Sequence, residues 1–408
     1  MNILLINQPL NNRGDESAHR ALIRQLAKDL QAHIIVMYIN CYSLDSMRTY
    51  DMNIPQVEYV NIRSKRGYKY VNENLLIKYP YLKFLWSIHP TTRAALKLYK
   101  WADVVLCAPG GINMGGFQDW RHMFFLELAR YAHKPLIYFG RSFGPFPMDN
   151  ESQIKFKNFS DTLLKYFAFL SIRDGETEKL ATRMGLSYSS TLDTAFLDDT
   201  IVDVPAEVSS IIGDGKYMVF VPNQLLWHYS YKDKLSEDSL MDFYTNVIYK
   251  ILEHNKSLKV VMLPQIYNSN NNDVGFFCDI AKRMNNKNVV VIPDCYSSDI
   301  QQMIIRKSEF VIGARYHSIV FAINQGVPFI ALSYEHKISG LCATLHQEEY
   351  CIDITSSLSN HDTTNKVVEQ VSQLLPMLHK DKTVQQSAKA IVKSGYDSFL
   401  KSVAKYEK

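Results

Sequence analysis

The sequence has 408 residues, of which 47% are hydrophobic and 21% charged, and its formal net charge is +4. This length is enough for two domains, and the composition excludes a disordered or fibrous chain. The mild positive charge also excludes the dominant basic surface of a typical nucleic-acid-binding protein.

Three features bear on the location of the protein. The apolar run near the start is four residues long and follows no basic region, so we expect no signal peptide. We expect no transmembrane helix, because nowhere do about 18 apolar residues follow one another. The six cysteines match neither CxxC nor zinc-site spacing, which predicts no metal site and favours a reduced, cytoplasmic environment.

Short apolar runs alternate with amphipathic segments in the first half of the chain. The expected strands are residues 3–6, 34–38, 104–107, 136–139 and 167–172. The expected helices are residues 16–30, 120–131 and 151–165. Strands separated by helices predict a parallel sheet built from βαβ units.

The same alternation restarts after about residue 205. The expected strands are residues 217–221, 259–263, 289–292, 310–312 and 329–332. The expected helices are residues 236–254, 274–284 and 318–325. Two such series predict an α/β fold in which two Rossmann-like domains face a central cleft.

The boundary between these domains is expected in residues 198–215, where acidic residues, proline and glycine cluster. This gives an N-terminal domain at 1–204 and a C-terminal domain at 205–380. The remaining segment, 381–408, contains an amphipathic helix at 382–405 that we expect to pack back on the first domain.

Ligands of open parallel sheets bind beyond the carboxyl ends of the strands. The loops expected there are polar and rich in glycine: 7–16, 109–119, 140–145, 173–174, 222–228, 264–273, 313–317 and 333–337. Their convergence makes the cleft the expected binding site.

The stretch Gly313-Ala-Arg-Tyr-His317 is the most informative of these loops. It lies where a strand passes into a helix, so free backbone N–H groups and the helix dipole favour an anion. Arg315 adds contacts to a carboxylate or phosphate, and His317 can transfer a proton near neutral pH. On pattern alone, a surface arginine and a capping histidine explain the stretch equally well.

Other strand-end residues have two interpretations each. Lys337 is a second cation for the same anion or a solvated lysine. Asp15 is a functional carboxylate or a charge at a helix start. Arg173 and Asp174 are functional or form a strand-end ion pair. The paired glycines at 110–111 and 115–116 match neither the dinucleotide-binding nor the P-loop pattern.

Residues 62–101 differ from the rest of the chain. They contain nine Lys or Arg, a single acidic residue and eight aromatic residues. This composition fits an interfacial contact with an anionic membrane, or capture of a phosphorylated lipid-linked sugar. A basic, solvated face over a small core is the equal alternative.

Taken in order, the strand-end loops resemble those of the polysaccharide pyruvyl transferase family. The matching motifs are N-x-G-D (Asn12, Gly14, Asp15), a glycine-rich loop (Gly110 and Gly111, with Ile112 where a third glycine is common), G-x-S-x-G-P (140–145), S-x-R-D (171–174), D-x-A-F (193–196), R-x-H (Arg315, His317), G-V-P (326–328) and Y-x-x-K (Tyr334, Lys337). The resemblance covers roughly residues 1–345, without 62–101 and the tail.

The resemblance implies a GT-B-like fold, phosphoenolpyruvate as donor substrate, no cofactor, and a pair of sugar hydroxyls as acceptor. The product is a cyclic pyruvate ketal on a surface polysaccharide, with phosphate released. We assign proton transfer to His317 and the acceptor hydroxyls to Asp15 or Asp193. The expected substrate-binding residues are Arg315, Lys337, Arg173, Asn12, Gly14, Gly110, Gly111 and Tyr334.

The basic, aromatic segment 62–101 favours a lipid-linked acceptor, used at the inner face of the membrane. Two other functions stay open at this point. One is a GT-B glycosyltransferase that uses a nucleotide sugar, whose diphosphate the same helix start would hold. The other is a non-catalytic glycan-binding protein, which would show no turnover of any donor.

Overall fold

The structure is a computed structural model that describes residues 1–8, 11–40, 54–111, 113–228, 231, 234–267, 272–355, 358 and 361–407. Ile112 and parts of the expected loops 7–16 and 264–273 lie outside these residues. Contacts divide the chain into two compact units. Unit 1 comprises Met1–Leu10, Ala18–Asp198 and Ile391–Lys408, and unit 2 comprises Asn11–Ser17 and Asp199–Ala390.

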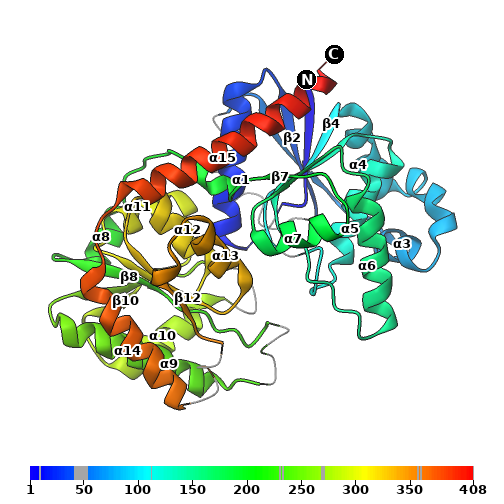
Figure 1. Ribbon diagram of the computed structural model, residues 1–408. Coiled ribbons are helices and arrows are strands. Elements are labelled where there is room, and N and C mark those ends of the chain that lie inside the picture. Colours follow the sequence, from blue (N-terminus) through cyan, green and yellow to red (C-terminus); the bar gives the residue numbers. More distant parts are fainter. Residues whose placement is uncertain are drawn as a thin grey trace. The chain divides into compact units, whose positions relative to one another are not determined.

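Unit 1 contains a parallel seven-stranded sheet with the order β3-β2-β1-β4-β5-β6-β7 (Figure 1). Its strands are β1 (Asn2–Ile6), β2 (His33–Ile39), β3 (Val57–Ile62), β4 (Val104–Cys107), β5 (Leu136–Arg141), β6 (Phe169–Ile172) and β7 (Ser189–Ser190). Ile3 and Leu5 join one hydrophobic cluster, and Leu4 and Ile6 join another. Because successive strand residues point to opposite faces, both faces of the sheet are buried.

Helices supply the rest of both clusters. The longer helices are α1 (Arg13–Asp29), α4 (Pro90–Trp101), α5 (Trp120–Tyr131), α6 (Glu151–Leu164) and α7 (Gly175–Arg183). The short ones are η1 (Tyr70–Asn74), α3 (Leu75–Ile77), η2 (Pro80–Ser87), η3 (Thr194–Leu197) and η6 (Ala404–Tyr406). The end of α15 (Lys382–Val403) also packs in unit 1, where Tyr396 and Phe399 join the cluster of Ile3 and Leu5.

Unit 2 contains a parallel six-stranded sheet with the order β10-β9-β8-β11-β12-β13. Its strands are β8 (Tyr217–Val221), β9 (Lys259–Met262), β10 (Val289–Val291), β11 (Val311–Gly313), β12 (Phe329–Ser333) and β13 (Cys351–Asp353). Its helices are α8 (Ala206–Ile212), α9 (Glu237–His254), α10 (Asp273–Met284), α11 (Ser298–Arg306), α12 (Tyr316–Asn324), α13 (His336–Thr344), η4 (Glu348–Tyr350), α14 (His361–Leu374) and η5 (Leu375–Met377). The loops that follow the carboxyl ends of β8, β9, β11 and β12 carry residues of the candidate site.

The structure differs from the sequence-based expectations at several places. The strands β3, β7 and β13 were not expected, and β6 begins at Phe169 instead of residue 167. In the contact division, residues 11–17 belong to unit 2 and residues 391–408 to unit 1. In the described part of the chain, no helix has the length and apolar character needed to span a membrane.

Candidate functional site

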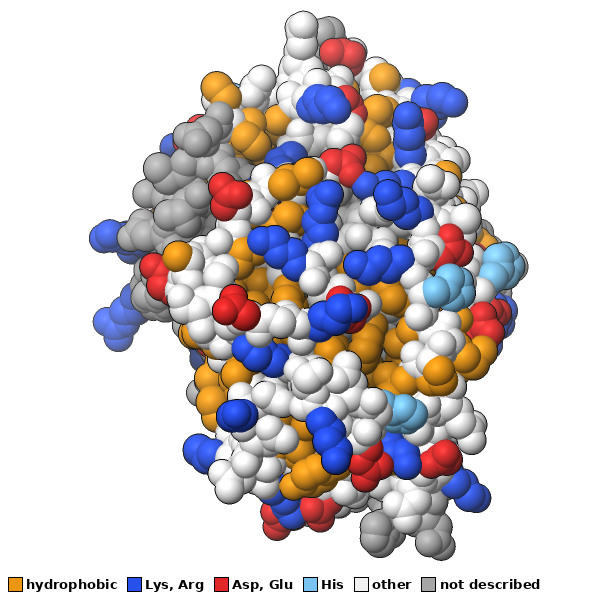
Figure 2. All heavy atoms as spheres, turned by 90° about the vertical axis from the view of Figure 1, so that its left-hand side faces the viewer, with side chains coloured by type: hydrophobic (Ala, Val, Ile, Leu, Met, Phe, Trp, Pro, Cys, Tyr) orange, Lys and Arg blue, Asp and Glu red, His pale blue; other side chains and the backbone are white. Residues whose placement is uncertain are grey.

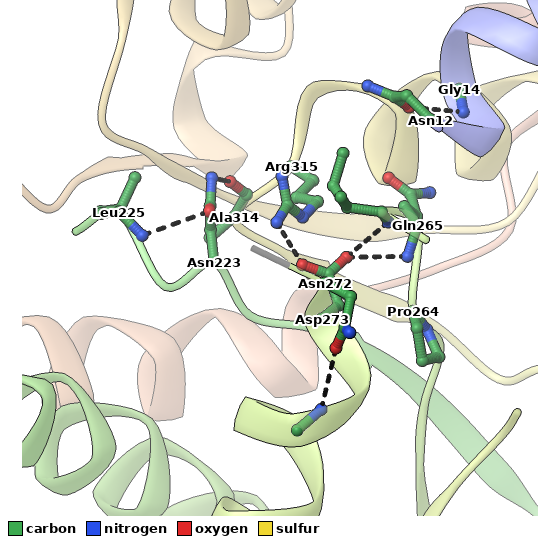
Figure 3. Close-up of polar contacts among 12 residues, drawn as sticks. Asn12, Gly14, Asn223, Leu225, Pro264, Gln265, Asn272, Asp273, Ala314 and Arg315 are labelled. Atoms are coloured by element: carbon green, nitrogen blue, oxygen red, sulfur yellow. Dashed lines mark hydrogen bonds and ion pairs between the residues drawn. The ribbon is translucent and has the colours of Figure 1, made fainter. Parts of the chain in front are cut away.

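Arg315 ends the loop after β11 and lies directly before α12, where it is 7% exposed. Its Nη2 atom forms an ion pair with Asp273 Oδ1, at the start of α10 (Figure 3). The other oxygen of Asp273, Oδ2, accepts hydrogen bonds from the backbone N–H groups of Gln265 and Ile266, both at 2.8 Å. An ion pair and hydrogen bonds of this kind offset the cost of burying a charge.

The loop after β9 also binds the residues that begin α1. The Arg13 N–H donates to the Gln265 carbonyl at 2.8 Å, Tyr267 N–H donates to Asn11, and Asn12 forms an isolated antiparallel bridge with Ile266. The side-chain oxygen of Asn12 then accepts from the N–H of Gly14 at 2.8 Å, which caps α1. The expected N-x-G-D helix start is thus held by backbone pairing inside unit 2.

His317 lies in the first turn of α12, directly against Gly14. A Cβ atom placed on Gly14 would be only 2.0 Å from Cγ and Nδ1 of the His317 ring. Glycine is therefore required at position 14 for this close approach. The motif N-x-G-D and the motif R-x-H, which lie far apart in the sequence, meet at this contact.

The charged neighbours of Gly14 differ in their surroundings. Arg13 is buried, pairs with Glu16 at 2.5 Å and lies over the Tyr267 ring at 3.7 Å, so it holds the structure together. Asp15 is partly exposed, and its carboxylate makes no hydrogen bond or ion pair with any residue that the structure describes. Asp15 is therefore the carboxylate here that is available to a ligand.

Lys337 lies at the start of α13, 3.4 Å through Nζ from Glu335 Oε2. Burial opposes ionisation of Glu335, but the charges of Lys337 and His228 outweigh it, and the pKa of Glu335 is lowered. Burial raises the pKa of Tyr334 well above its usual value, and the charges of Glu335 and Arg315 also act on it. Tyr334 therefore lies near both the Lys337–Glu335 pair and Arg315.

Two of the expected site residues pair with each other in unit 1. Arg173 Nη1 forms an ion pair with Asp193 Oδ2, and both side chains are buried. Arg173 Nε also donates to Ser142 Oγ at 3.3 Å, while Asp193 Oδ1 accepts from Ala195 N–H at 2.9 Å. Both carboxylate oxygens of Asp193 are thus in use, as expected for a residue that fixes the segment after β7.

The glycine-rich loop after β4 is braced by Arg141 at the end of β5. Arg141 donates to the carbonyl of Ala108, to that of Gly111 at 3.2 Å and to Asn113 Oδ1 at 2.9 Å. Gly110 has φ +145°, a backbone conformation that favours glycine. These contacts fix the backbone of the loop in unit 1, whereas Asn12, Gly14, Asp15, Arg315, His317, Tyr334 and Lys337 belong to unit 2.

Four neighbours of these residues were not singled out from the sequence: His228, Gln265, Asp273 and Glu335. Each lies in a strand-end loop that was expected to carry the site, but nothing in its residue type marked it. The available signal was the pair Asn272-Asp273 at a helix start, where the Asn272 side chain caps α10. Among the described residues, no group of three or more His, Cys, Asp or Glu is placed to hold a metal ion.

The chain matches a known protein family over most of its length. The family model for polysaccharide pyruvyl transferase matches residues 12–336. The chain belongs to the polysaccharide pyruvyl transferase family. This confirms the expected family and makes the protein a transferase of polysaccharide biosynthesis. A comparison with curated proteins finds no match.

Solved structures of other enzymes resemble this pyruvyl transferase in fold. UDP-GlcNAc 2-epimerase from Methanocaldococcus jannaschii has a TM-score of 0.58 at 15% identity, covering 96% of this chain and 98% of that one. UDP-GlcNAc 2-epimerase from Neisseria meningitidis, bound to UDP-GlcNAc, has a TM-score of 0.59 at 12% identity, covering 99% and 100%. TcCGT1 in complex with UDP has a TM-score of 0.57 at 11% identity, covering 99% and 98%. These similarities confirm a GT-B-like fold with two Rossmann-like units.

Proposed function

We propose that this transferase moves the pyruvyl group of phosphoenolpyruvate onto two hydroxyls of a sugar, as a cyclic ketal, with release of phosphate. The contact of His317 with Gly14, beside the Arg315–Asp273 pair, carries the proposal. It joins an imidazole, a buried cation and the starts of α1 and α12. A donor with a carboxylate and a phosphate needs such cations and helix starts, and the chemistry requires no cofactor.

In the proposed reaction, His317 gives a proton to C3 of the donor, and positive charge develops at C2. The first sugar oxygen bonds to C2 and loses its proton. The bond from C2 to the phosphate oxygen then breaks, and phosphate leaves with the electron pair. The second sugar oxygen bonds to C2, loses its proton and closes the ketal. A positioned proton donor contributes about 10²- to 10⁴-fold to such a rate.

The remaining roles follow from the surroundings of each residue. Arg315 and Lys337 hold the acid groups of the donor, with Asn12, Gly14 and Tyr334 around them. The free carboxylate of Asp15 supports its role in accepting a proton from the sugar hydroxyl. Asp193 is the weaker candidate for that role, because Arg173 and the Ala195 N–H occupy its two oxygens. Arg173, Gly110 and Gly111 stay proposed contacts of unit 1 with substrate.

The segment between β3 and α4 supports a lipid-linked acceptor at the inner face of the membrane. Within residues 62–101, Tyr68, Trp86 and Tyr99 are core residues, whereas six other apolar side chains are exposed: Tyr70, Ile77, Tyr79, Tyr81, Phe84 and Ile88. We call these six the aromatic patch. Tyr81 is 73% exposed and Phe84 54%. Exposed tyrosine and phenylalanine side chains are typical of a surface that enters the headgroup region of a bilayer.

The charged side chains beside the aromatic patch also support contact with a membrane. Lys69 and Lys78 flank the aromatic patch, are exposed, and form no ion pair with any residue that the structure describes. Unpaired cations beside aromatic side chains favour anionic lipid. The face drawn in Figure 2 is different, since acidic, basic and hydrophobic side chains are interspersed on it.

The test is incubation with phosphoenolpyruvate and a panel of sugar acceptors in deuterated water, followed by mass spectrometry. We expect a ketal whose methyl group has gained deuterium, together with free phosphate. His317→Ala should lower phosphate release about 10²- to 10⁴-fold, and His379→Ala, an exposed histidine, should not change it. Absence of any ketal, or normal turnover in folded His317→Ala, would refute the proposal.

The fold favours one alternative function. Two of the three solved structures named above carry UDP or UDP-GlcNAc, so a transferase that uses a nucleotide sugar is the second candidate. Titration with UDP and with phosphoenolpyruvate separates the two, because each function requires binding of its own donor. Turnover of either donor would exclude a non-catalytic glycan-binding protein.

A further inference from the structure

We propose that Gln265 is a further donor-binding residue and that Asp273 positions Arg315 beside it. In this arrangement the Arg315 guanidinium and the Gln265 side-chain amide together hold one acid group of the donor. The inference rests on the proposed function, since it takes phosphoenolpyruvate as the donor. None of the sequence motifs includes Gln265 or Asp273.

The first observation is a pair of buried N–H donors without acceptors. The side chain of Gln265 is 1% exposed, and its Nε2 atom has no hydrogen-bond partner in the structure. The Nε atom of Arg315 is buried and equally without a partner. Among the residues described, Asp273 is the only partner of the Arg315 guanidinium. Buried donors without acceptors are costly, and a ligand that supplies the acceptors removes that cost.

The second observation is that one carboxylate fixes both donors. Asp273 Oδ2 accepts the backbone N–H of Gln265 at 2.8 Å, and Oδ1 accepts from Arg315 Nη2. Figure 3 shows the Arg315 and Gln265 side chains on the side of Asp273 toward Asn12 and Gly14. The Gln265 carbonyl is tied to Arg13 N–H at 2.8 Å, which holds this loop against the start of α1. Asp273 therefore sets the position of both groups relative to the helix start.

Charge decides what kind of ligand suits the pair. Asp273 neutralises Arg315, so the guanidinium is not a lone buried cation. The free edge of the guanidinium and the amide both donate hydrogen bonds, and the nearby helix starts favour negative charge. An oxyacid group satisfies these donors. A carboxylate and a phosphate share this chemistry, and phosphoenolpyruvate carries both.

The test measures phosphoenolpyruvate binding by titration calorimetry, which needs no acceptor sugar. Gln265→Met keeps the length of the side chain but removes the donor, and should weaken binding about tenfold. Gln265→Glu places an anion at the same position and should weaken binding further; it decides the question if Gln265→Met does not fold. Asn272→Ala is the matched control, because it removes the cap of α10 but none of the Asp273 contacts. It should lower the melting temperature and leave the Kd unchanged.

A double-variant cycle tests the positioning role of Asp273. Asp273→Asn should weaken binding, but combined with Arg315→Ala it should bind no worse than Arg315→Ala alone, because it acts through Arg315. Additive losses would overturn that role. Pyruvate and inorganic phosphate, titrated separately, identify the acid group: the fragment whose binding falls in Gln265→Met is the one held.

Two results distinguish failure of this inference from failure of the proposed function. Unchanged phosphoenolpyruvate binding in Gln265→Met or Gln265→Glu, with binding lost in Arg315→Ala, would overturn the role of Gln265 and leave the proposed function standing. No binding of phosphoenolpyruvate to the wild-type protein would overturn both.

Discussion

The His317 ring fills the space that a side chain at Gly14 would need, with only 2.0 Å between its Cγ and a Cβ atom built at that glycine. The imidazole and the start of α1 are therefore in direct contact, with no room for a larger residue. The ring proposed as the proton donor is held against a helix start that favours an anion.

Gly14→Ala should displace His317 and lower phosphate release about 10²-fold, the effect of a misplacement of about 1 Å. Overpacking should also cost about 1–3 kcal/mol of stability. Phosphate release and thermal unfolding measure the two effects. Gly340→Ala is the control, because an added Cβ there meets nothing within 4 Å. Full activity in Gly14→Ala would show that the contact does not matter for turnover.

The variants Asp15→Ala and Asp193→Ala should distinguish a carboxylate that acts in turnover from one that stabilises the fold. Asp15→Ala should lower turnover about 10²- to 10⁴-fold and change the free energy of unfolding by no more than about 1 kcal/mol. Asp193→Ala leaves the buried Arg173 charge without its partner and should cost about 3–5 kcal/mol. Phosphate release and denaturant unfolding give both values. A stable, inactive Asp193→Ala protein would transfer the proton-accepting role to Asp193.

The protein should lose stability in mild acid because of His122. Burial, together with the charge of Arg141, lowers the pKa of His122 well below 6.5. Below pH 6.5 the unfolded chain therefore binds a proton that the folded protein does not, so stability rises with pH through this range and falls as the pH drops. The slope for one such group is at most about 1.4 kcal/mol per pH unit.

Urea unfolding between pH 7.5 and 5 checks this expectation. His122→Phe keeps an aromatic ring next to Tyr138, which contacts His122 edge-on, and should flatten the pH dependence. An unchanged slope in that variant would assign the acid sensitivity to other groups, of which His228, with its lowered pKa, is the first candidate.

The aromatic patch should bind anionic vesicles. Wild-type protein should sediment with phosphatidylglycerol vesicles more than with phosphatidylcholine vesicles, and less as salt is raised. Replacing Tyr81 and Phe84 by Ser, or Lys69 and Lys78 by Glu, should reduce binding to the anionic vesicles. Tyr249→Ser is the control, since Tyr249 is an exposed aromatic residue of unit 2. Equal binding by all variants would contradict a membrane role of the patch.

The central strands of both sheets could be predicted because they are buried on two faces and form continuous apolar runs. The edge strands β3, β7 and β13 were missed for the opposite reason. β3 has only half-buried or exposed residues, and β7 and β13 contain two and three residues. An edge strand needs no apolar run, because pairing on one side is enough to form it.

The candidate site likewise has features that are local in the sequence and features that depend on folding. The loop that carries Arg315 and His317 could be predicted because it joins a strand to a helix, which is a local feature. The partner of Arg315, Asp273, lies 42 residues away in the sequence, and only folding brings the two together. The contact of Gly14 with His317 depends on the tertiary structure in the same way. The local sequence pattern therefore predicts the loops, whereas the residue pairs inside them form only in the folded chain.

The backbone pairing of residues 11–13 with the loop after β9 imposes an order on synthesis. Residues 11–13 leave the ribosome first, and their partners follow roughly 250 residues later, a delay of about 10–50 s at ordinary translation rates. During that interval Asn12 and Arg13 are made but unpaired. The nascent chain thus completes its first sheet before the beginning of α1 can be anchored, and any product truncated before residue 265 lacks that anchor.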